Sequence, residues 1–147
     1  MLRGRKAGDP NMTTTPMRIT KSALSLNVPD VAASAQFVQD HFGFSEVMAA
    51  DGFSSLASES AGFNLIFLRT GLGSFKPEHA AGSAGQGLLV VFEVDEIDDE
   101  YARLLAGGAR VITPIETEPW GERYFQVQDS NGIIYQLVQW VETPGGA

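Results

Sequence analysis

The sequence consists of two similar halves, and this duplication constrains the fold more than any other feature. The segment VPDVAASAQFVQDHFG of the first half corresponds to VDEIDDEYARLLAGG of the second, and ESAGFNLIFL corresponds to DSNGIIYQLV. The offset is about 65 to 70 residues. A unit of this size leaves one face of its sheet uncovered, so a second unit, in the same chain or in another, has to close it.

Each half predicts a strand, a helix and three further strands, which is an α+β arrangement of two tandem βαβββ modules. Leu24, Leu26 and Val28 alternate with polar residues, as in a strand, and Asp30 and Asp95 each stand where a helix cap is expected. Tight-turn pairs and glycines separate the remaining segments. The expected strands are 18–28, 45–50, 53–60 and 63–70 in the first half and 88–94, 109–116, 123–129 and 133–140 in the second, with helices at 31–42 and 97–106.

Changes in composition set the expected boundaries of the modules. The segment 71–87 is dense in glycine, alanine and serine and has no period, so it is interpreted as a flexible linker or lid loop carrying Phe75 and His79. The basic, polar start precedes a second methionine and is interpreted as a leader. The expected segments are therefore a leader at 1–16, a first module at 17–70, the loop, a second module at 88–141 and a tail at 142–147.

Composition excludes several classes of function. The chain has 147 residues and no cysteine, which rules out disulfides, thiolate metal sites and cysteine nucleophiles, and its two histidines are His41 and His79. A net charge of −8 repels phosphate backbones and anionic lipid heads and attracts cationic molecules, so we expect no nucleic acid partner. We find neither an apolar run long enough for a bilayer nor a secretory signal, which predicts a cytoplasmic protein without a membrane partner.

Two stretches resemble the glyoxalase, bleomycin-resistance and extradiol-dioxygenase superfamily, also called the vicinal oxygen chelate fold. LNVPDVAASAQFVQDHFGF is similar to the first strand and helix of that superfamily, and PWGERYFQVQDSNGIIYQLVQW is similar to its closing hairpin. The resemblance extends over about residues 19 to 141. It implies that the modules form a cup-shaped curved sheet, usually completed by pairing two chains, and that many members bind a divalent metal at its floor through His, Glu or Gln.

The positions that the resemblance assigns to metal ligands do not carry a suitable set of donors. They correspond to Ala23 and Leu89 on the first strand of each module, to residues 64–66, and to Gln136 on the final strand. A divalent ion needs three or more donors, usually including an anion or an imidazole. His41 ends a helix and His79 lies in the long loop, so neither supplies one. We expect no metal and no cofactor.

Other catalytic motifs are also missing from the sequence: it has no nucleophile elbow, P-loop or zinc-protease helix. The acidic residues of 93–100 fit a solvated strand end and first helical turn, although Glu93 shares a strand face with Leu89 and Val91. Aromatic residues gather in the later strands, and Trp120 stands at a turn, where an indole typically covers a cavity or packs on a partner.

The sequence thus favours a metal-independent binding protein that resembles the bleomycin-resistance branch. Its expected role is resistance by sequestering an antibiotic or other secondary metabolite, a small aromatic or cationic organic molecule, in a homodimer. No residue is assigned a catalytic role. Two alternatives stay open: a metal-dependent lyase or dioxygenase with atypical ligands, and a metal-free lyase or isomerase using Tyr124, Glu93 or Glu122. The candidate ligand-binding residues are Ser25, Phe53, Phe75, Leu89, Glu93, Trp120, Tyr124 and Gln136.

Overall fold

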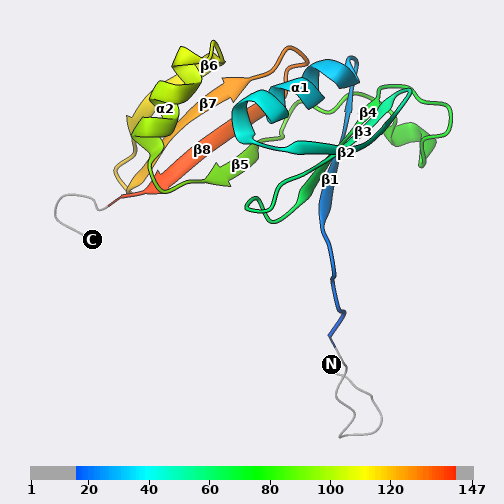
Figure 1. The fold of residues 1–147 in the computed structure, drawn as a ribbon, viewed down its shortest axis with the longest axis horizontal. Coiled ribbons are helices and arrows are strands. Elements are labelled where there is room, and N and C mark those ends of the chain that lie inside the picture. Colours follow the sequence, from blue (N-terminus) through cyan, green and yellow to red (C-terminus); the bar gives the residue numbers. More distant parts are fainter. Residues whose placement is uncertain (1–15, 142–147) are drawn as a thin grey trace, which may run out of the picture.

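A computed structural model describes residues 16–141 and contains two four-stranded sheets, each with one helix (Figure 1). The first sheet has the strand order β1-β4-β3-β2 and the second has the order β5-β8-β7-β6. In each sheet the first and last strands of the module pair in parallel, and the other pairs are antiparallel. The predicted α+β fold of two tandem βαβββ modules is confirmed.

The elements agree with the expected ones to within three residues, except that the first strand begins at Ala23 and not at residue 18. The first module contains β1 (Ala23–Val28), α1 (Val31–Phe42), β2 (Ser45–Ala50), β3 (Phe53–Ala57) and β4 (Asn64–Arg69). The second contains β5 (Val90–Glu93), α2 (Ile97–Ala106), β6 (Arg110–Thr117), β7 (Glu122–Gln128) and β8 (Ile134–Trp140). A single 3₁₀ turn, η1 (Glu78–Ala80), interrupts the loop between them. No helix of the described region is long and apolar enough to cross a membrane.

Local signals account for the two ends of α1. The side chain of Asp30 accepts a hydrogen bond from the backbone N–H of Ala33 at 3.1 Å, which satisfies one of the donors left unpaired at a helix start. Gly43 ends the helix with φ of 74°, in the left-handed region that glycine adopts without a steric cost. Both features were expected from the sequence.

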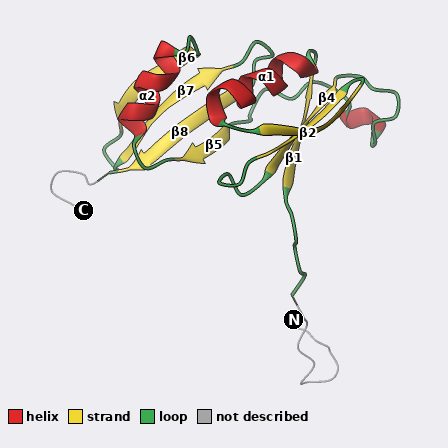
Figure 2. Cartoon of the chain, viewed as in Figure 1, coloured by secondary structure: helices red, strands yellow, loops and turns green. Residues whose placement is uncertain are grey.

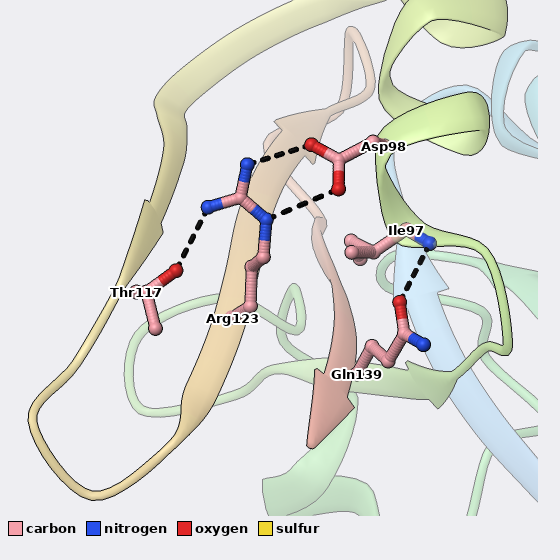
Figure 3. A network of polar contacts seen from close by, with 5 residues as sticks. All are labelled: Ile97, Asp98, Thr117, Arg123 and Gln139. Carbon is pink, nitrogen blue, oxygen red and sulfur yellow. Dashed lines mark hydrogen bonds and ion pairs between the residues drawn. The ribbon is translucent and has the colours of Figure 1, made fainter. Parts of the chain in front are cut away.

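The start of α2 differs from the expectation, because Asp95 does not cap it. Glu96 occupies the cap position and its side chain makes no capping hydrogen bond. The side chain of Gln139 on β8 does this instead, because its Oε1 accepts from the N–H of Ile97 at 3.0 Å (Figure 3). Its Nε2 donates to the carbonyl of Asp95. The physical reason is that Gln139 already satisfies the free N–H of Ile97, and its amide can at the same time donate to the backbone of Asp95, so the side chain of Asp95 is left without a described hydrogen bond.

An ion pair also connects α2 to the β6–β7 hairpin (Figure 3). The guanidinium of Arg123 donates to both oxygens of Asp98, at 2.6 and 3.2 Å, and to the hydroxyl of Thr117 at 2.8 Å. This contact lowers the pKa of Asp98, chiefly through the hydrogen bonds from Arg123. It occupies Arg123 on the α2 side of the sheet.

The core lies between each sheet and the helices, and α1 contributes to both modules (Figure 2). Leu65 and Phe67 on β4 are fully buried beneath α1. The ring of Phe37 on α1 stacks on Tyr135 of β8, with centroids 5.4 Å apart. Phe42 lies 5.1 Å from Phe92 of β5. Helix α1 therefore joins the two sheets through aromatic contacts.

A buried carboxylate forms a second link between the modules. Asp129, which is 3% exposed, follows β7 and accepts from the hydroxyl of Ser34 on α1 at 2.7 Å and from the hydroxyl of Tyr135 at 3.2 Å. It also accepts from the backbone N–H groups of Asn131 and Ile133, at 2.9 and 3.0 Å. Burial, and then the negative charge of Asp129, raises the pKa of Tyr135. Four donors thus satisfy a charge that would be costly to bury alone.

The inter-module loop makes specific contacts with β1. The side-chain amide of Asn27 donates to the carbonyls of Ala80 and Gly82, at 3.2 and 3.1 Å. The N–H of Ala84 donates to the backbone carbonyl of Asn27 at 2.8 Å. One buried asparagine therefore fixes the middle of the segment interpreted as a linker or lid.

Candidate functional site

Each sheet has an open face, defined as the face turned away from the helix of its own module. On the second sheet, Phe125 and Val127 of β7 point to the helix side and are fully buried. The residues that alternate with them, Glu122, Tyr124 and Gln126, therefore lie on the open face. The register places them directly opposite Trp140, Val138 and Gln136 of β8.

A directed chain of hydrogen bonds crosses this open face. The hydroxyl of Thr113 donates to Oε1 of Gln126 at 2.7 Å, and Nε2 of Gln126 donates to Oε1 of Gln136 at 2.7 Å. Nε2 of Gln136 then donates to Glu122 at 3.3 Å, and the indole N–H of Trp120 donates to the other oxygen of Glu122 at 3.1 Å. All donors in this chain point toward Glu122, so the dipoles stabilise its negative charge.

Tyr124 lies between two further carboxylates. Its hydroxyl is 2.8 Å from Oε1 of Glu116 and 2.9 Å from Oε2 of Glu118. A phenol has one proton and can donate to one of these oxygens at a time, so the pair retains unused acceptor capacity. The hydrogen bonds to Glu116 and Glu118 raise the pKa of Tyr124 well above its ordinary value of 10, so its hydroxyl stays protonated.

Two exposed tryptophans flank the carboxylates. Trp120 in the β6–β7 turn is 64% exposed, and Trp140 at the end of β8, opposite Glu122, is 56% exposed. We call the group made by these side chains the hairpin patch; it consists of Glu116, Glu118, Trp120, Glu122, Tyr124 and Trp140. Indole faces and carboxylates together attract cations.

The arginines of the hairpin do not neutralise the patch. Arg123 is engaged by Asp98 on the opposite side of the sheet. Arg110 pairs with Gln128 at the far end of the hairpin from the Trp120 turn. The three glutamates of the hairpin patch therefore form an acidic surface. A ligand with a positive charge is the complementary partner.

The structure brings three of the predicted ligand-binding residues together. Trp120, Tyr124 and Gln136 belong to one polar surface, with Glu122 bonded to both Trp120 and Gln136. Leu89, which is 45% exposed, precedes β5, and Glu93 ends that strand. The register gives Glu93 the open face, opposite Val138, but places it on the edge strand of the sheet.

The other predicted ligand-binding residues lie apart from this group. Ser25 is exposed on β1, and Phe53 begins β3; both are on the open face of the first sheet, where they pair with Ile66 and Leu68. Phe75 is half-buried in the inter-module loop. Within residues 16–141, no described hydrogen bond or aromatic contact connects these three to the hairpin patch. Whether any of the predicted residues binds a ligand remains a prediction.

Sequence reasoning missed several members of the hairpin patch. Glu116 and Glu118 were not selected, although they stand two residues apart before a turn, as neighbours of one face do on a strand. Trp140 was not selected either. The turns at 118–121 and 129–132 are the signals that would have placed Trp140, because they set the register of β7 against β6 and β8.

The family-implied metal does not fit the residues present. Ala23 and Leu89 offer no lone pair, and the oxygen of Gln136 already accepts from Gln126. No group of three or more His, Cys, Asp or Glu side chains that could hold an ion occurs in the region that the structure describes. His41 lies in the last turn of α1, where burial lowers its pKa, and His79 is exposed on η1.

Comparison with known proteins agrees with this architecture. Residues 20–137 match the family model described as the Glyoxalase/Bleomycin resistance protein/Dioxygenase superfamily. A search of curated proteins gave no match. A glyoxalase/bleomycin resistance protein/dioxygenase from Nocardioides has 26% identity, a TM-score of 0.71 and coverage of 90% of this chain and 92% of that one.

Two further solved structures share the fold. TioX from Micromonospora sp. ML1 has 21% identity and a TM-score of 0.65 over 83% of this chain and 99% of that one. A lactoylglutathione lyase from Agrobacterium tumefaciens has 22% identity and a TM-score of 0.66 over 86% and 96%. Because the family model covers most of the described region and both modules are present, the chain belongs to the Glyoxalase/Bleomycin resistance protein/Dioxygenase superfamily.

Proposed function

We propose that this protein binds a flat, cationic organic molecule on the hairpin patch, without a metal ion, and protects its host by sequestering that molecule. The observation that carries the proposal is the position of Glu116 and Glu118 on either side of Tyr124, beside the bonded pair Glu122 and Trp120. Three acidic side chains and two exposed indoles on one surface offer both charge and a stacking platform.

The contacts account for useful affinity without any reaction. A cation over the face of Trp120 or Trp140 gains about 0.5 to 2 kcal/mol, depending on how far the contact is desolvated. The hydroxyl of Tyr124 donates to only one of Glu116 and Glu118 at a time, and an N–H of the ligand's ammonium or iminium group can donate to the other. A ligand that stacks and also pairs with a carboxylate reaches micromolar affinity when apolar burial adds to these terms, and nanomolar affinity when it is well enclosed.

We propose further that a second copy of the chain covers this surface in a homodimer. Trp120 and Trp140 remain more than half exposed in the isolated chain, so a ligand stacked on them would be enclosed on one side only. Leu89, which precedes the edge strand β5, is 45% exposed and gives an apolar contact for association. Sedimentation equilibrium tests this: a monomer at micromolar concentration would refute it.

The binding proposal is tested by titrating the protein with a panel of planar cationic drugs and their neutral analogues. Both tryptophans of the chain belong to the hairpin patch, so quenching of intrinsic fluorescence reports binding there directly. We expect Glu122→Gln to weaken binding of the cationic compounds about fivefold, as for the loss of one partly exposed ion pair. Glu78→Gln, which removes an equal charge from the exposed η1 turn, should have no effect.

The resistance role and a cytoplasmic location are parts of the same proposal. Support for resistance is the family that the chain belongs to, one branch of which is described by its bleomycin resistance. A host expressing the protein should tolerate a higher concentration of a compound that binds, and the Glu122→Gln variant should reduce that protection. Fractionation of the same cells tests the location.

The raised pKa of Tyr124 between two carboxylates favours a second candidate function, that of a metal-free lyase or isomerase. A hydroxyl kept protonated by two carboxylates is suited to donate a proton to a bound substrate. Mass spectrometry of a bound compound before and after incubation separates the two functions. An unchanged mass supports sequestration, and a changed mass that depends on Tyr124 supports catalysis.

A further inference from the structure

A cleft of about 670 Å³ lies between the two modules and shares no residue with the hairpin patch. Its walls are the C-terminal end of α1, the turn between β3 and β4, strand β5, and the side of α2 that carries Glu100 and Arg103. The volume falls in the range of small-molecule sites in proteins. Unlike the open face, the cleft combines elements of both modules, so it exists only when the two are packed together.

The floor of the cleft is aromatic. Phe42, Phe44 and Phe92 all line it, and the rings of Phe42 and Phe44 lie 5.1 and 6.0 Å from that of Phe92. Phe44 is buried, but Phe42 and Phe92 are only half-buried, so parts of their rings face the cleft. An apolar body of about the size of one or two rings would cover this surface and remove it from water.

The rim of the cleft is acidic, and its arginine is already engaged. Arg103 donates to Glu100 at 2.8 Å and to the backbone carbonyl of His41 at 2.9 Å. Asp40 and Glu93 remain as rim carboxylates without a basic partner among the described ion pairs. Burial lowers the pKa of His41, so its imidazole does not balance these charges at neutral pH.

We propose that this cleft is a second binding site and that it takes a compact organic ammonium compound, with its apolar body on Phe42 and Phe92 and its charged nitrogen beside Glu93. Phe92 and Glu93 alternate in direction along β5 but both line the cleft, so the cleft reaches around the C-terminal end of that strand. The phenylalanines line its inner part and the exposed Glu93 lies at its outer part, which sets the orientation of the ligand. The proposal does not depend on binding at the hairpin patch. Each site uses its own residues.

The test uses 2-(1-naphthyl)ethylamine and its neutral analogue 2-(1-naphthyl)ethanol, titrated into ¹⁵N-labelled full-length protein. For the amine we expect amide shifts at Gly43, Ser60 and Val94, which line the cleft, and binding at least about fivefold tighter than for the alcohol. Equal affinity of the two compounds would overturn the assignment of an ammonium ligand. Shifts confined to Tyr124, Glu122 and Trp140 would overturn the assignment of the cleft.

Three variants test whether the two compounds bind in the cleft and whether the carboxylate of Glu93 contacts the amine. Glu93→Gln should weaken the amine about fivefold and leave the alcohol unchanged. Glu59→Gln is the matched control, since it removes the same charge from an exposed residue of the neighbouring turn that does not line the cleft. Ser60→Phe, at an exposed position on the rim, should abolish the amide shifts that both compounds cause at Gly43 and Val94, while Glu78→Gln on the exposed η1 turn leaves those shifts unchanged. Equal effects of Glu93→Gln and Glu59→Gln would refute the site.

Discussion

Replacing Asp129 with asparagine should destabilise the protein strongly, because this carboxylate connects the modules through four hydrogen bonds. Asparagine keeps one oxygen for the N–H groups of Asn131 and Ile133, but it places an NH₂ group where the second oxygen accepts from Ser34 and Tyr135. Each hydrogen bond to a charged group contributes about 1.5 to 3 kcal/mol net, so losing two costs about 3 to 6 kcal/mol. Tyr135 is fully buried and finds no water as a substitute.

The assay is urea unfolding followed by circular dichroism, with Asp95→Asn as the control. Asp95 is exposed and its carboxylate makes no described hydrogen bond, so that variant should stay within about 0.5 kcal/mol of the parent. For Asp129→Asn we expect a lower midpoint with an unchanged slope, and a melting temperature reduced by about 10 to 20 °C. Stability within about 0.5 kcal/mol of the parent would refute the reasoning that this network joins the modules.

Other consequences of the structure can be measured in the same way. Gln139→Ala should cost about 1 kcal/mol in urea unfolding and Asp95→Ala almost nothing, and the reverse order would restore Asp95 as the cap of α2. Burial lowers the pKa of His41 below the value of 6.5 that it has in the unfolded chain, so the free energy of unfolding should fall as the pH drops below about 6.5. His41→Gln should remove this part of the pH dependence, and an unchanged dependence would contradict the assignment. Asn27→Ala should make the loop at 71–87 more sensitive to limited proteolysis, and equal cleavage rates would show that Asn27 does not anchor it.

The sequence predicted the fold well because its strongest signals are local. Alternation in β1, the cap at Asp30 and the turn at Asp51 and Gly52 each depend on neighbouring residues, and each agrees with the structure. Because these signals occur in the same order in both halves, they were sufficient to predict two tandem modules. Asp95 shows where such reasoning ends, because the start of α2 is capped by Gln139, which is 44 residues away.

The candidate site was less accessible to sequence reasoning, because it depends on which strands are neighbours and in what register. Gln136 was predicted from the family resemblance and Tyr124 from its aromatic, ionisable side chain, and the two lie on one face. Glu116 and Trp140 join them only through the pairing of β7 with both β6 and β8. The cleft between the modules is a stronger case. The cleft forms because Phe42 of the first module contacts Phe92 of the second, and no local sequence pattern predicts that contact.

The central claim is that this protein holds a cationic guest through its own side chains and without an ion. The most direct measurement is calorimetric titration of proflavine, a planar cation, into protein dialysed against EDTA and into the same protein supplied with Zn²⁺, Mn²⁺ or Fe²⁺. We predict equal affinity in all samples, and a loss of most of it in the double variant Glu116→Gln, Glu118→Gln. Binding that appears only after metal is added, or that the double variant leaves intact, would contradict the account.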